Sequence, residues 1–256
     1  MSDLWQMLRG DSLLLLRDLP SDSVDAVITD PPYSSGGKAR DVKAPSSGKY
    51  TSAEFPEIVG DARDQRSLLA WCSMWMAECL RICRPGGAIA SFTDWRQFPT
   101  MSDAIQAGGW VWRGTATWCK PIGSCRSFAG RVTQASEYVL WGTKGARAIE
   151  PGIPPINGFW VERAPIGERE HMTEKPIGVM RDLAKLCIPG GVILDPFAGA
   201  ATTGVGALLE GRRFLGIETS GEYFPIACRR LAETESGADR GSTAIGQGAL
   251  FAAAAP

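Results

Sequence analysis

The sequence has few of the residues that metal sites and membrane spans require. It holds one histidine, His171, and none of its seven cysteines forms a CxxC pair, so a zinc site is not expected. No apolar run reaches the roughly 18 residues of a membrane-spanning helix. The cysteine count is odd and no signal peptide opens the chain, which together predict reduced thiols in the cytoplasm.

Charge is nearly balanced, because the formal net charge is −1, and bulk charge therefore predicts no polyanionic partner. Two stretches are nevertheless basic. Residues 34–50 contain a single acid, Asp41, and the basic residues Lys38, Arg40, Lys43 and Lys49. Residues 113–147 contain a single acid, Glu137, and the basic residues Arg113, Lys120, Arg126, Arg131, Lys144 and Arg147. Such surfaces suit a polyanion, although an ordinary solvated surface remains the alternative.

The order of apolar segments predicts an α/β fold. Strands are expected at 24–30, 88–94, 110–120 and 136–144, and helices at 67–83, 98–107, 175–187 and 221–235; residues 192–218 have the pattern strand, glycine turn, helix, strand. Strands that alternate with helices favour a single doubly wound, mostly parallel sheet. We expect one domain over 1–235, with a long mobile loop at 34–66 and a disordered tail at 236–256.

The segment DPFAGAATTG, residues 195–204, is typical of a ligand-binding turn at the carboxyl end of a strand. Gly199 allows close approach of a ligand, and Thr202 or Thr203 is expected to cap the next helix. Glu218 ends the following strand and can reach ribose hydroxyls. The pattern is not GxGxxG, which favours S-adenosylmethionine over a dinucleotide, with Asp195 facing its amino group; a plain tight turn is the alternative.

The segment ITDPPY, residues 28–33, places a carboxylate, two prolines and a tyrosine at the end of a strand. An exocyclic amine of a nucleobase is a weak nucleophile, because its lone pair is delocalised into the ring. The carboxylate of Asp30 and the carbonyl of Pro31 can accept its two N–H groups, while Pro31 and Pro32 fix the backbone. Tyr33 can stack on the base. A proline turn that merely ends the strand is the alternative.

A base inside a duplex cannot reach such a pocket, so the target must be flipped out at a cost of about a few kcal/mol. Contacts from a basic surface to the DNA backbone would offset this cost. We expect these contacts from Lys38 and Arg40 in the loop 34–66, and from a second set of residues in the later basic stretch: Lys120, Arg126, Phe128 and Arg131.

These motifs together resemble the beta class of amino-DNA methyltransferases, in which DPPY precedes the FxG cofactor segment. Further matching segments are GDSLLLLRDLPSDSVDAVITDPPY at 10–33, WCKPIGSCRSFAGRVTQASEYVLWGTKG at 118–145 and HMTEKPIGVMRDLAKLC at 171–187. The resemblance covers about 8–232. It implies a Rossmann-like methyltransferase fold, with a small target-recognition region inserted at about 121–172.

The resemblance also implies roles for individual residues. The catalytic set is Asp30, Pro31, Pro32 and Tyr33. The cofactor set is Asp11, Ser12, Asp30, Lys175, Asp195, Phe197, Gly199, Thr202, Thr203 and Glu218. The implied reaction is transfer of a methyl group from S-adenosylmethionine to N6 of adenine in double-stranded DNA, with S-adenosylhomocysteine as product, in an enzyme of bacterial, phage or prophage type.

Two departures from the family pattern keep alternatives open. The family has Ser-Gly after FxG, whereas this chain has Ala200-Ala201, so a DNA-binding relative without catalysis remains an alternative. N4 of cytosine is the second possible target, and an NAD oxidoreductase is a third, weaker reading. The segment between Lys144 and His171 is short for a recognition domain, which suggests a homodimer. No nuclease motif is visible, so a cognate restriction nuclease stays open.

Other conspicuous residues have plainer interpretations. Trp71, Trp75 and Met76 occupy core spacing on a helix, and Trp118 is expected in the core rather than beside the base. His171 is interpreted as the start of the motif that contains Lys175, because methyl transfer needs no base to begin.

Overall fold

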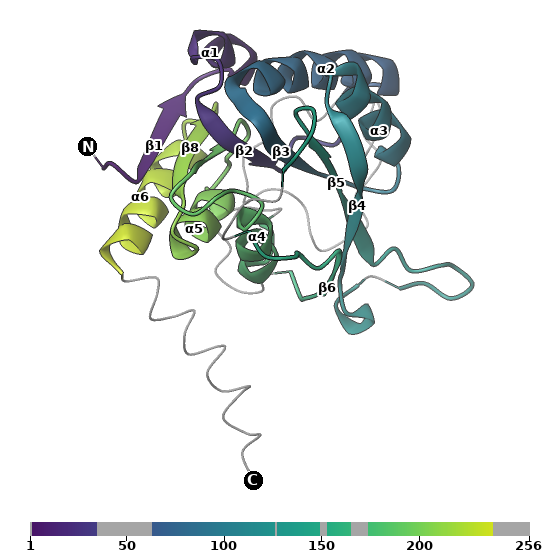
Figure 1. Cartoon of the computed structure of the whole chain (residues 1–256). Helices are drawn as coiled ribbons and strands as arrows, with labels where there is room; N and C mark the ends of the chain where they lie inside the picture. Colours follow the sequence, from purple (N-terminus) through teal and green to yellow (C-terminus); the bar gives the residue numbers. More distant parts are fainter. Residues whose placement is uncertain (1, 35–62, 126, 149–152, 165–173, 238–256) are drawn as a thin grey trace.

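The computed structural model describes residues 2–34, 63–125, 127–148, 153–164 and 174–237, and its centre is an eight-stranded sheet (Figure 1). The strands in chain order are β1 (Trp5–Arg9), β2 (Val24–Thr29), β3 (Cys83–Thr93), β4 (Val111–Cys119), β5 (Ser136–Thr143), β6 (Phe159–Val161), β7 (Val192–Asp195) and β8 (Arg213–Glu218). Their order across the sheet is β1-β8-β7-β2-β3-β5-β4-β6.

The sheet is mostly parallel, as the sequence predicts. Strands β1, β8, β7, β2 and β3 pair in parallel, and β6 is parallel to β4. Strand β5 is antiparallel to both β3 and β4. The carboxyl ends of β2, β7 and β8 therefore meet at one edge, which is where ligands bind in open α/β sheets.

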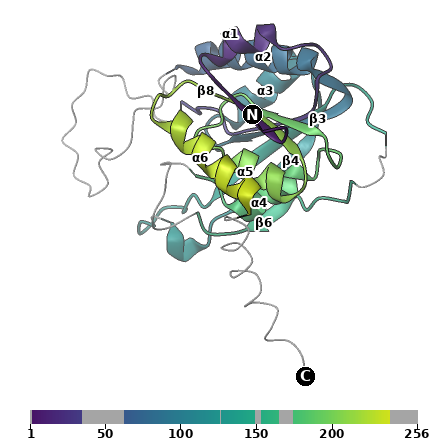
Figure 2. The same ribbon diagram turned by 90° about the vertical axis from the view of Figure 1, so that its left-hand side faces the viewer.

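Helices cover both faces of the sheet, so the doubly wound architecture is confirmed (Figures 1 and 2). They are α1 (Ser12–Asp18), α2 (Gln65–Ile82), α3 (Phe98–Ala107), α4 (Ile177–Ala184), α5 (Thr202–Leu209) and α6 (Tyr223–Ser236), together with a 3₁₀ turn, η1 (Ile122–Ser124). Figure 1 shows α1, α2 and α3 on one face and α4, α5 and α6 on the other.

Each face has its own apolar core, because successive residues of a strand point to opposite sides. Val27 of β2 packs with Trp75 of α2, whereas Ala26 and Ile28 pack with Met180 of α4 on the other face. Strand β2 is buried along almost its whole length. This is the pattern of a central strand in a parallel sheet, and it fixes the position of Asp30 at the end of β2.

Helix α2 forms as the sequence predicts, although it begins earlier. Its buried residues are Leu68, Cys72, Trp75, Met76, Cys79 and Ile82, which recur at three- and four-residue spacing. Asp64 caps the first turn by accepting from the backbone N–H of Ser67 at 2.8 Å. The helix ends before Cys83, where β3 starts directly, so the glycines at 86–87 lie within a strand and not in a loop.

Three elements were not expected from the sequence. Strand β1 and helix α1 lie in an N-terminal segment to which we assigned no structure, and β6 lies in the Pro/Gly-rich stretch at 145–172. These elements are short, and β6 has only three residues, so each gives too few repeats for a periodicity. The two strands depend on pairing with distant partners, β8 for β1 and β4 for β6.

Some sequence predictions fall outside the described residues. They concern Lys38, Arg40, Arg126, His171, most of the loop 34–66 and nearly all of the tail 236–256. Within the expected recognition region at 121–172, residues 136–143 form β5, an interior strand of the sheet between β3 and β4.

Candidate active site

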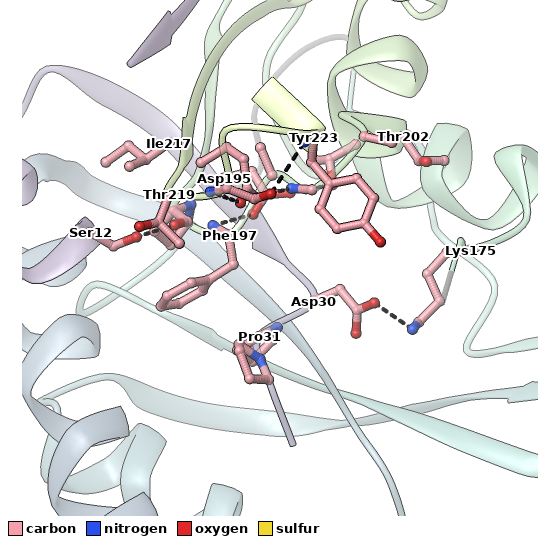
Figure 3. Close-up of a pocket in the computed structure, with 18 of the residues that line it drawn as sticks. Ser12, Asp30, Pro31, Lys175, Asp195, Phe197, Thr202, Ile217, Thr219 and Tyr223 are labelled. Carbon is pink, nitrogen blue, oxygen red and sulfur yellow. Dashed lines mark hydrogen bonds and ion pairs between the residues drawn. The ribbon is translucent and has the colours of Figure 1, made fainter. Parts of the chain in front are cut away.

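A cavity of about 290 Å³ lies at the carboxyl ends of β2, β7 and β8 (Figure 3). All ten residues predicted to bind the cofactor line it, as do all four predicted catalytic residues. In Figure 3, Ser12, Ile217 and Thr219 lie on one side, Lys175 and Thr202 lie on the other, and Asp195 and Phe197 lie between them. The structure therefore brings together segments from the first and the last quarter of the sequence.

Asp195 sits at the end of β7 and is almost fully buried. Its carboxylate accepts hydrogen bonds from Thr29 at 2.7 Å, from Thr203 at 2.6 Å and from the backbone N–H of Phe197 at 3.0 Å. Burial raises the pKa of Asp195 to about 6, although these hydrogen bonds favour the charged form. This carboxylate is held rigidly at the floor of the cavity.

The glycine turn after β7 is built around a positive φ of 52° at Gly199, a conformation that glycine adopts readily. The Gly199 N–H donates to Glu218 at 2.7 Å, and the Ser220 N–H donates to its other oxygen at 2.7 Å. Burial raises the pKa of Glu218. Glu218 therefore joins the ends of β7 and β8 while it faces the cavity.

The predicted helix cap at Thr202 or Thr203 is wrong. Ala201 occupies the N-cap position of α5, with φ 60° and ψ 36°, and the cap has no side-chain hydrogen bond. The Thr203 hydroxyl donates to Asp195, and Thr202 accepts from Arg230 at 3.2 Å. Ala201, in the left-handed region, leads the chain into α5 without a side-chain cap. The hydroxyl groups of Thr202 and Thr203 instead form hydrogen bonds with neighbouring side chains.

An aromatic cluster forms one wall of the cavity. The ring of Phe197 lies 5.1 Å from Trp71 and 5.2 Å from Trp75, measured between centroids, and the Arg63 guanidinium lies 4.3 Å above Trp71. Trp75 and Met76 are core residues, as predicted, but Trp71 is partly exposed and lines the cavity. Helical spacing alone could not predict that Trp71 lines the cavity, because this depends on the turn after β7, which places Phe197 against Trp71.

The start of helix α1 lines the cavity beside the glycine turn. The carboxylate of Asp11 caps this helix by accepting from the Leu13 N–H at 2.8 Å. The Ser12 hydroxyl donates to the carbonyl of Pro196, which ties α1 to the glycine turn. Both residues line the cavity, so their predicted position is reproduced even though no element was predicted there.

The DPPY segment continues directly from β2 into the cavity. Pro31 is buried, and Asp30, Pro32 and Tyr33 are partly buried. The Tyr33 hydroxyl donates to one oxygen of Asp30, and Lys175 contacts the other at 2.5 Å. Burial raises the pKa of Asp30, against the attraction of Lys175. Burial and the nearby Asp30 raise the pKa of Tyr33 well above its ordinary value.

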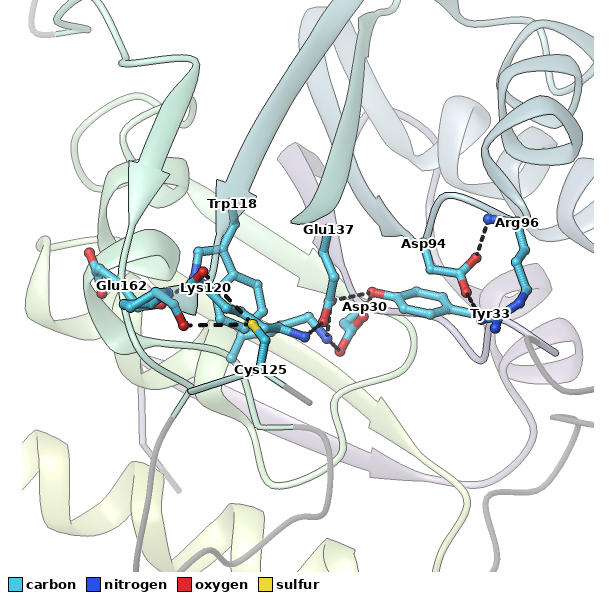
Figure 4. Close-up of polar contacts among 11 residues, drawn as sticks. Asp30, Tyr33, Asp94, Arg96, Trp118, Lys120, Cys125, Glu137 and Glu162 are labelled. Atoms are coloured by element: carbon cyan, nitrogen blue, oxygen red, sulfur yellow. Dashed lines mark hydrogen bonds and ion pairs between the residues drawn. The ribbon is translucent and has the colours of Figure 1, made fainter. Parts of the chain in front are cut away.

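A second carboxylate, Glu137, completes this group (Figure 4). Its two oxygens lie 2.5 Å from Lys120 and 3.3 Å from Lys175. Burial alone would raise the pKa of Glu137, but the two lysines outweigh it, so the pKa lies below its ordinary value. Burial alone would lower the pKa of Lys175, but Asp30 and Glu137 outweigh it, so the pKa lies above its ordinary value. The four groups form an alternating row of charges: Asp30, Lys175, Glu137 and Lys120.

Comparisons with known proteins agree with this geometry. A family model described as DNA methylase, of the N6/N4 methyltransferases, matches residues 24–229. The chain belongs to this DNA methylase family. The methylase is 27% identical to the protein YubD of Escherichia coli strain K12, over 93% of this chain and 94% of that protein. It is 26% identical to the type II methyltransferase M.HinfI of Haemophilus influenzae, over 89% of this chain and 68% of M.HinfI.

Solved structures share the fold of this methylase. The M1.HpyAVI-SAM complex has a TM-score of 0.65 and 24% identity, and the match covers 89% of this chain and 99% of that chain. The PvuII DNA methyltransferase, which is specific for N4 of cytosine, has a TM-score of 0.67 and 19% identity, with 90% and 87% covered.

Three of the predicted DNA-contacting residues are described, and none of them lines the cavity of the methylase. Phe128 and Arg131 are exposed between η1 and β5, with the Arg131 guanidinium 5.7 Å from the ring of Phe128. Lys120 is half-buried in its ion pair with Glu137. Their contact with DNA stays a prediction.

The sequence analysis missed several residues of the methylase site. They are Arg63, Trp71, Glu137, Glu174, Ile217, Thr219, Ser220 and Tyr223. One signal was present: Glu137 is the single acid in the basic stretch from 113 to 147. Residues 219–223 follow the predicted strand that Glu218 ends, so they lie at the same sheet edge.

Two observations concern other kinds of site. Within the part of the chain that the structure covers, no three His, Cys, Asp or Glu side chains gather as metal ligands would. Among the helices formed by the described residues, none is both long and apolar enough to cross a bilayer.

Proposed function

We propose that this DNA methylase transfers a methyl group from S-adenosylmethionine to N6 of adenine in double-stranded DNA, by base flipping. The observation that carries the proposal is the cavity itself, because the DPPY carboxylate and the glycine turn line the same space. The preference for adenine depends on Asp30, since the related methyltransferases with Ser before the prolines tend to act on cytosine.

The lining of the cavity fits S-adenosylmethionine. Carboxylates of Asp11, Asp30, Asp195 and Glu218 line it, together with the aromatic face of Phe197. Such a set suits a cationic ligand with an amino group, ribose hydroxyls and an adenine ring. It disfavours the pyrophosphate of NAD, which would meet several acids. Structures of M1.HpyAVI and of TTHA0409 from Thermus thermophilus that contain S-adenosylmethionine have the same fold.

The residues that would hold the cofactor are those of the turn and its surroundings. Glu218 would bind the ribose, Asp195 would face the amino group, and Phe197 would pack against the adenine ring. When bound, S-adenosylmethionine supplies an electrophilic methyl group and leaves as S-adenosylhomocysteine. Ala200 and Ala201 keep the turn small, and Ala201 holds the left-handed conformation that the family's glycine would adopt easily.

The DPPY residues would act on the base. Asp30 accepts one N–H of the exocyclic amine, and the carbonyl of Pro31 accepts the other. These two hydrogen bonds hold the hydrogens away from the ring plane and localise the nitrogen lone pair. Tyr33 stacks on the ring while its hydroxyl donates to Asp30. The proton leaves the nitrogen after it has become cationic, so no separate base is needed to begin.

The test is transfer of a tritiated methyl group to unmodified plasmid DNA, followed by sequencing for modified bases. We expect methylated adenine with the wild-type chain, and a loss of at least about a hundredfold with Asp30→Asn, because a charged acceptor is removed. Binding of S-adenosylhomocysteine, followed by thermal shift, should survive in this variant. Asp103→Asn, on the exposed face of α3, is the matched control and should retain full transfer.

If the methyl group is found on cytosine, the target is the second candidate, N4 of cytosine, and not N6 of adenine. The similarity to the PvuII enzyme favours this second candidate. Binding of the cofactor and DNA without any transfer would favour an inactive DNA-binding relative. A thermal shift with NAD alone would favour the oxidoreductase.

We also propose that the methylase acts as a homodimer in the cytoplasm. The support for a dimer is the short segment between Lys144 and residue 171, which leaves little chain for a recognition domain. All seven cysteines are free, which agrees with a reducing compartment. Light scattering that gives a monomer both with and without DNA would contradict the dimer.

A further inference from the structure

We propose that Glu137 is a positioning residue for methyl transfer, which holds Lys175 and offsets its charge so that Asp30 remains a strong hydrogen-bond acceptor. This inference rests on the proposed function of the same site. Glu137 itself is not among the residues that line the cavity, and it would act through Lys175 and Tyr33.

The geometry connects two carboxylates through one buried ammonium group. Lys175 is 5% exposed, and its Nζ lies 2.5 Å from Asp30 Oδ2 and 3.3 Å from Glu137 Oε2. The Tyr33 hydroxyl donates to Asp30 and lies 3.4 Å from Glu137. Glu137 therefore contacts both groups that donate to Asp30, from a different strand, as Figure 4 shows for Tyr33.

The charges explain why a second carboxylate is needed. If Lys175 faced Asp30 alone, its full charge would draw electron density from the carboxylate that must accept the N–H of the base. Glu137 shares that charge, and Lys120 in turn offsets Glu137 at 2.5 Å. The row of two acids and two bases is neutral, so burial does not force the protonation of Asp30.

The groups that face this row come from several elements. Asp30 and Tyr33 follow β2, Glu137 lies on β5, Lys120 follows β4, Lys175 precedes α4, and Asp94, which follows β3, acts on Tyr33 from farther away. The Glu137 charge raises the pKa of Asp30, whereas Lys175 lowers it. Removing one member of the row therefore changes the pH at which Asp30 ionises, in a direction that the sign of the removed charge sets.

The test measures kcat against pH, at saturating DNA and S-adenosylmethionine, for wild type, Glu137→Gln and Lys120→Gln. With Glu137→Gln we expect kcat on the plateau to fall about tenfold, since a hydrogen bond to a charged group is weakened. Its acid limb should move to lower pH, because Asp30 loses a negative neighbour. With Lys120→Gln the acid limb should move to higher pH, because Glu137 then draws Lys175 away from Asp30.

Controls separate this inference from folding and from the proposed function. Glu233→Gln, an exposed residue on α6, removes the same charge and should change neither kcat nor the limb. Thermal shifts with S-adenosylhomocysteine check that each variant keeps its cofactor site. If wild type transfers methyl groups but both variants keep its acid limb, the positioning role is wrong. If wild type transfers none, the proposed function fails instead.

Discussion

At the residue scale, two aspartates of the site have raised pKa values for the same first reason, burial, but their partners differ. Asp195 is held by neutral donors, Thr29, Thr203 and a backbone N–H, and has no cation within ion-pair distance among the described pairs. Asp30 is held by Lys175 and Tyr33. A carboxylate with neutral partners suits a cationic ligand, whereas one in a balanced row of charges can stay ionised toward a neutral base.

Tyr33→Phe should move the acid limb of kcat to higher pH. The Tyr33 hydroxyl lowers the pKa of Asp30 by donating to it, so its removal lets that pKa rise. The phenyl ring still stacks on the base, and we therefore expect the plateau to fall by less than about tenfold. The measurement is methyl transfer against pH at saturating substrates. Tyr33→Ala, which also loses the ring, should lose far more activity; equal losses would argue against the stacking role.

Asp195→Asn should stabilise the protein at alkaline pH and weaken the cofactor site. The pKa of Asp195 is raised from 3.8 to about 6 in the folded protein, so its contribution to stability is fully present below about pH 4 and is lost as the pH rises through 6. Asparagine resembles the protonated form at every pH. We expect a gain of up to about 3 kcal/mol at pH 8.

Urea unfolding of wild type and Asp195→Asn at pH 8 and at pH 5, without cofactor, checks this expectation. The difference between the two proteins should shrink at pH 5, where the native side chain is largely protonated. If the two proteins differed equally in free energy of unfolding at both pH values, a lost or gained hydrogen bond, and not the charge of Asp195, would be the cause of that difference. Binding of S-adenosylmethionine should weaken in the variant at both.

At the element scale, the turn between β7 and α5 contains two residues with positive φ, Gly199 and Ala201. Ala201 is fully buried and has a side chain in a conformation that disfavours one. Gly204, in the first turn of α5, has an ordinary φ but packs tightly: a Cβ there would lie 2.6 Å from Phe214 and Leu231. Glycine is therefore required at one of these positions by packing and favoured at the other by backbone conformation.

Ala201→Gly should stabilise the protein by about 0.5–1 kcal/mol, because relief of the left-handed strain exceeds the entropy that glycine loses on folding. Chemical denaturation with an unchanged m-value measures this gain. Gly204→Ala is the contrasting variant and should cost about 1–3 kcal/mol through overpacking. A destabilised Ala201→Gly would indicate that the Ala201 methyl group contributes more by packing than its backbone conformation costs.

At the scale of the whole molecule, the cavity and the surface expected to meet DNA lie at the same edge of the sheet, but at the ends of different strands. The cavity lies at the ends of β2, β7 and β8, while the exposed residues Phe128 and Arg131 lie in the segment between β4 and β5. The row from Asp30 to Lys120 runs from one region toward the other. Flipping moves a base from the second region to the first, so their position along one edge of the sheet suits the proposed reaction.

Arg131→Ala should weaken DNA binding by a similar factor for every sequence, and should reduce the slope of log affinity against log salt by about one. The reason is that one phosphate contact, and with it one released counterion, is lost. Phe128→Ala should lower affinity without changing the slope. Arg229→Ala, on the exposed side of α6, is the control. The measurement is titration of DNA with each variant at several salt concentrations. An unchanged slope for Arg131→Ala would mean that Arg131 does not contact a phosphate.

The sequence by itself determined the local chemistry of this protein. A carboxylate followed by two prolines, and a glycine turn after a strand, have conformations that the residues themselves fix, so Asp30 and Gly199 could be placed at strand ends without coordinates. The alternation of strands and helices predicted the layers. It could not show β6, which has three residues and depends on pairing with β4.

Only the tertiary structure decided which distant residues share a site. Glu137 and Lys175 reach the DPPY segment across separations of 104 and 145 residues, and Trp71 of α2 reaches Phe197 in the turn after β7. Such contacts depend on the order of strands in the sheet, and on β5 running antiparallel beside β3. Local sequence fixes backbone conformation and residue type, whereas packing between elements fixes which charges meet, and with them the pKa of Asp30.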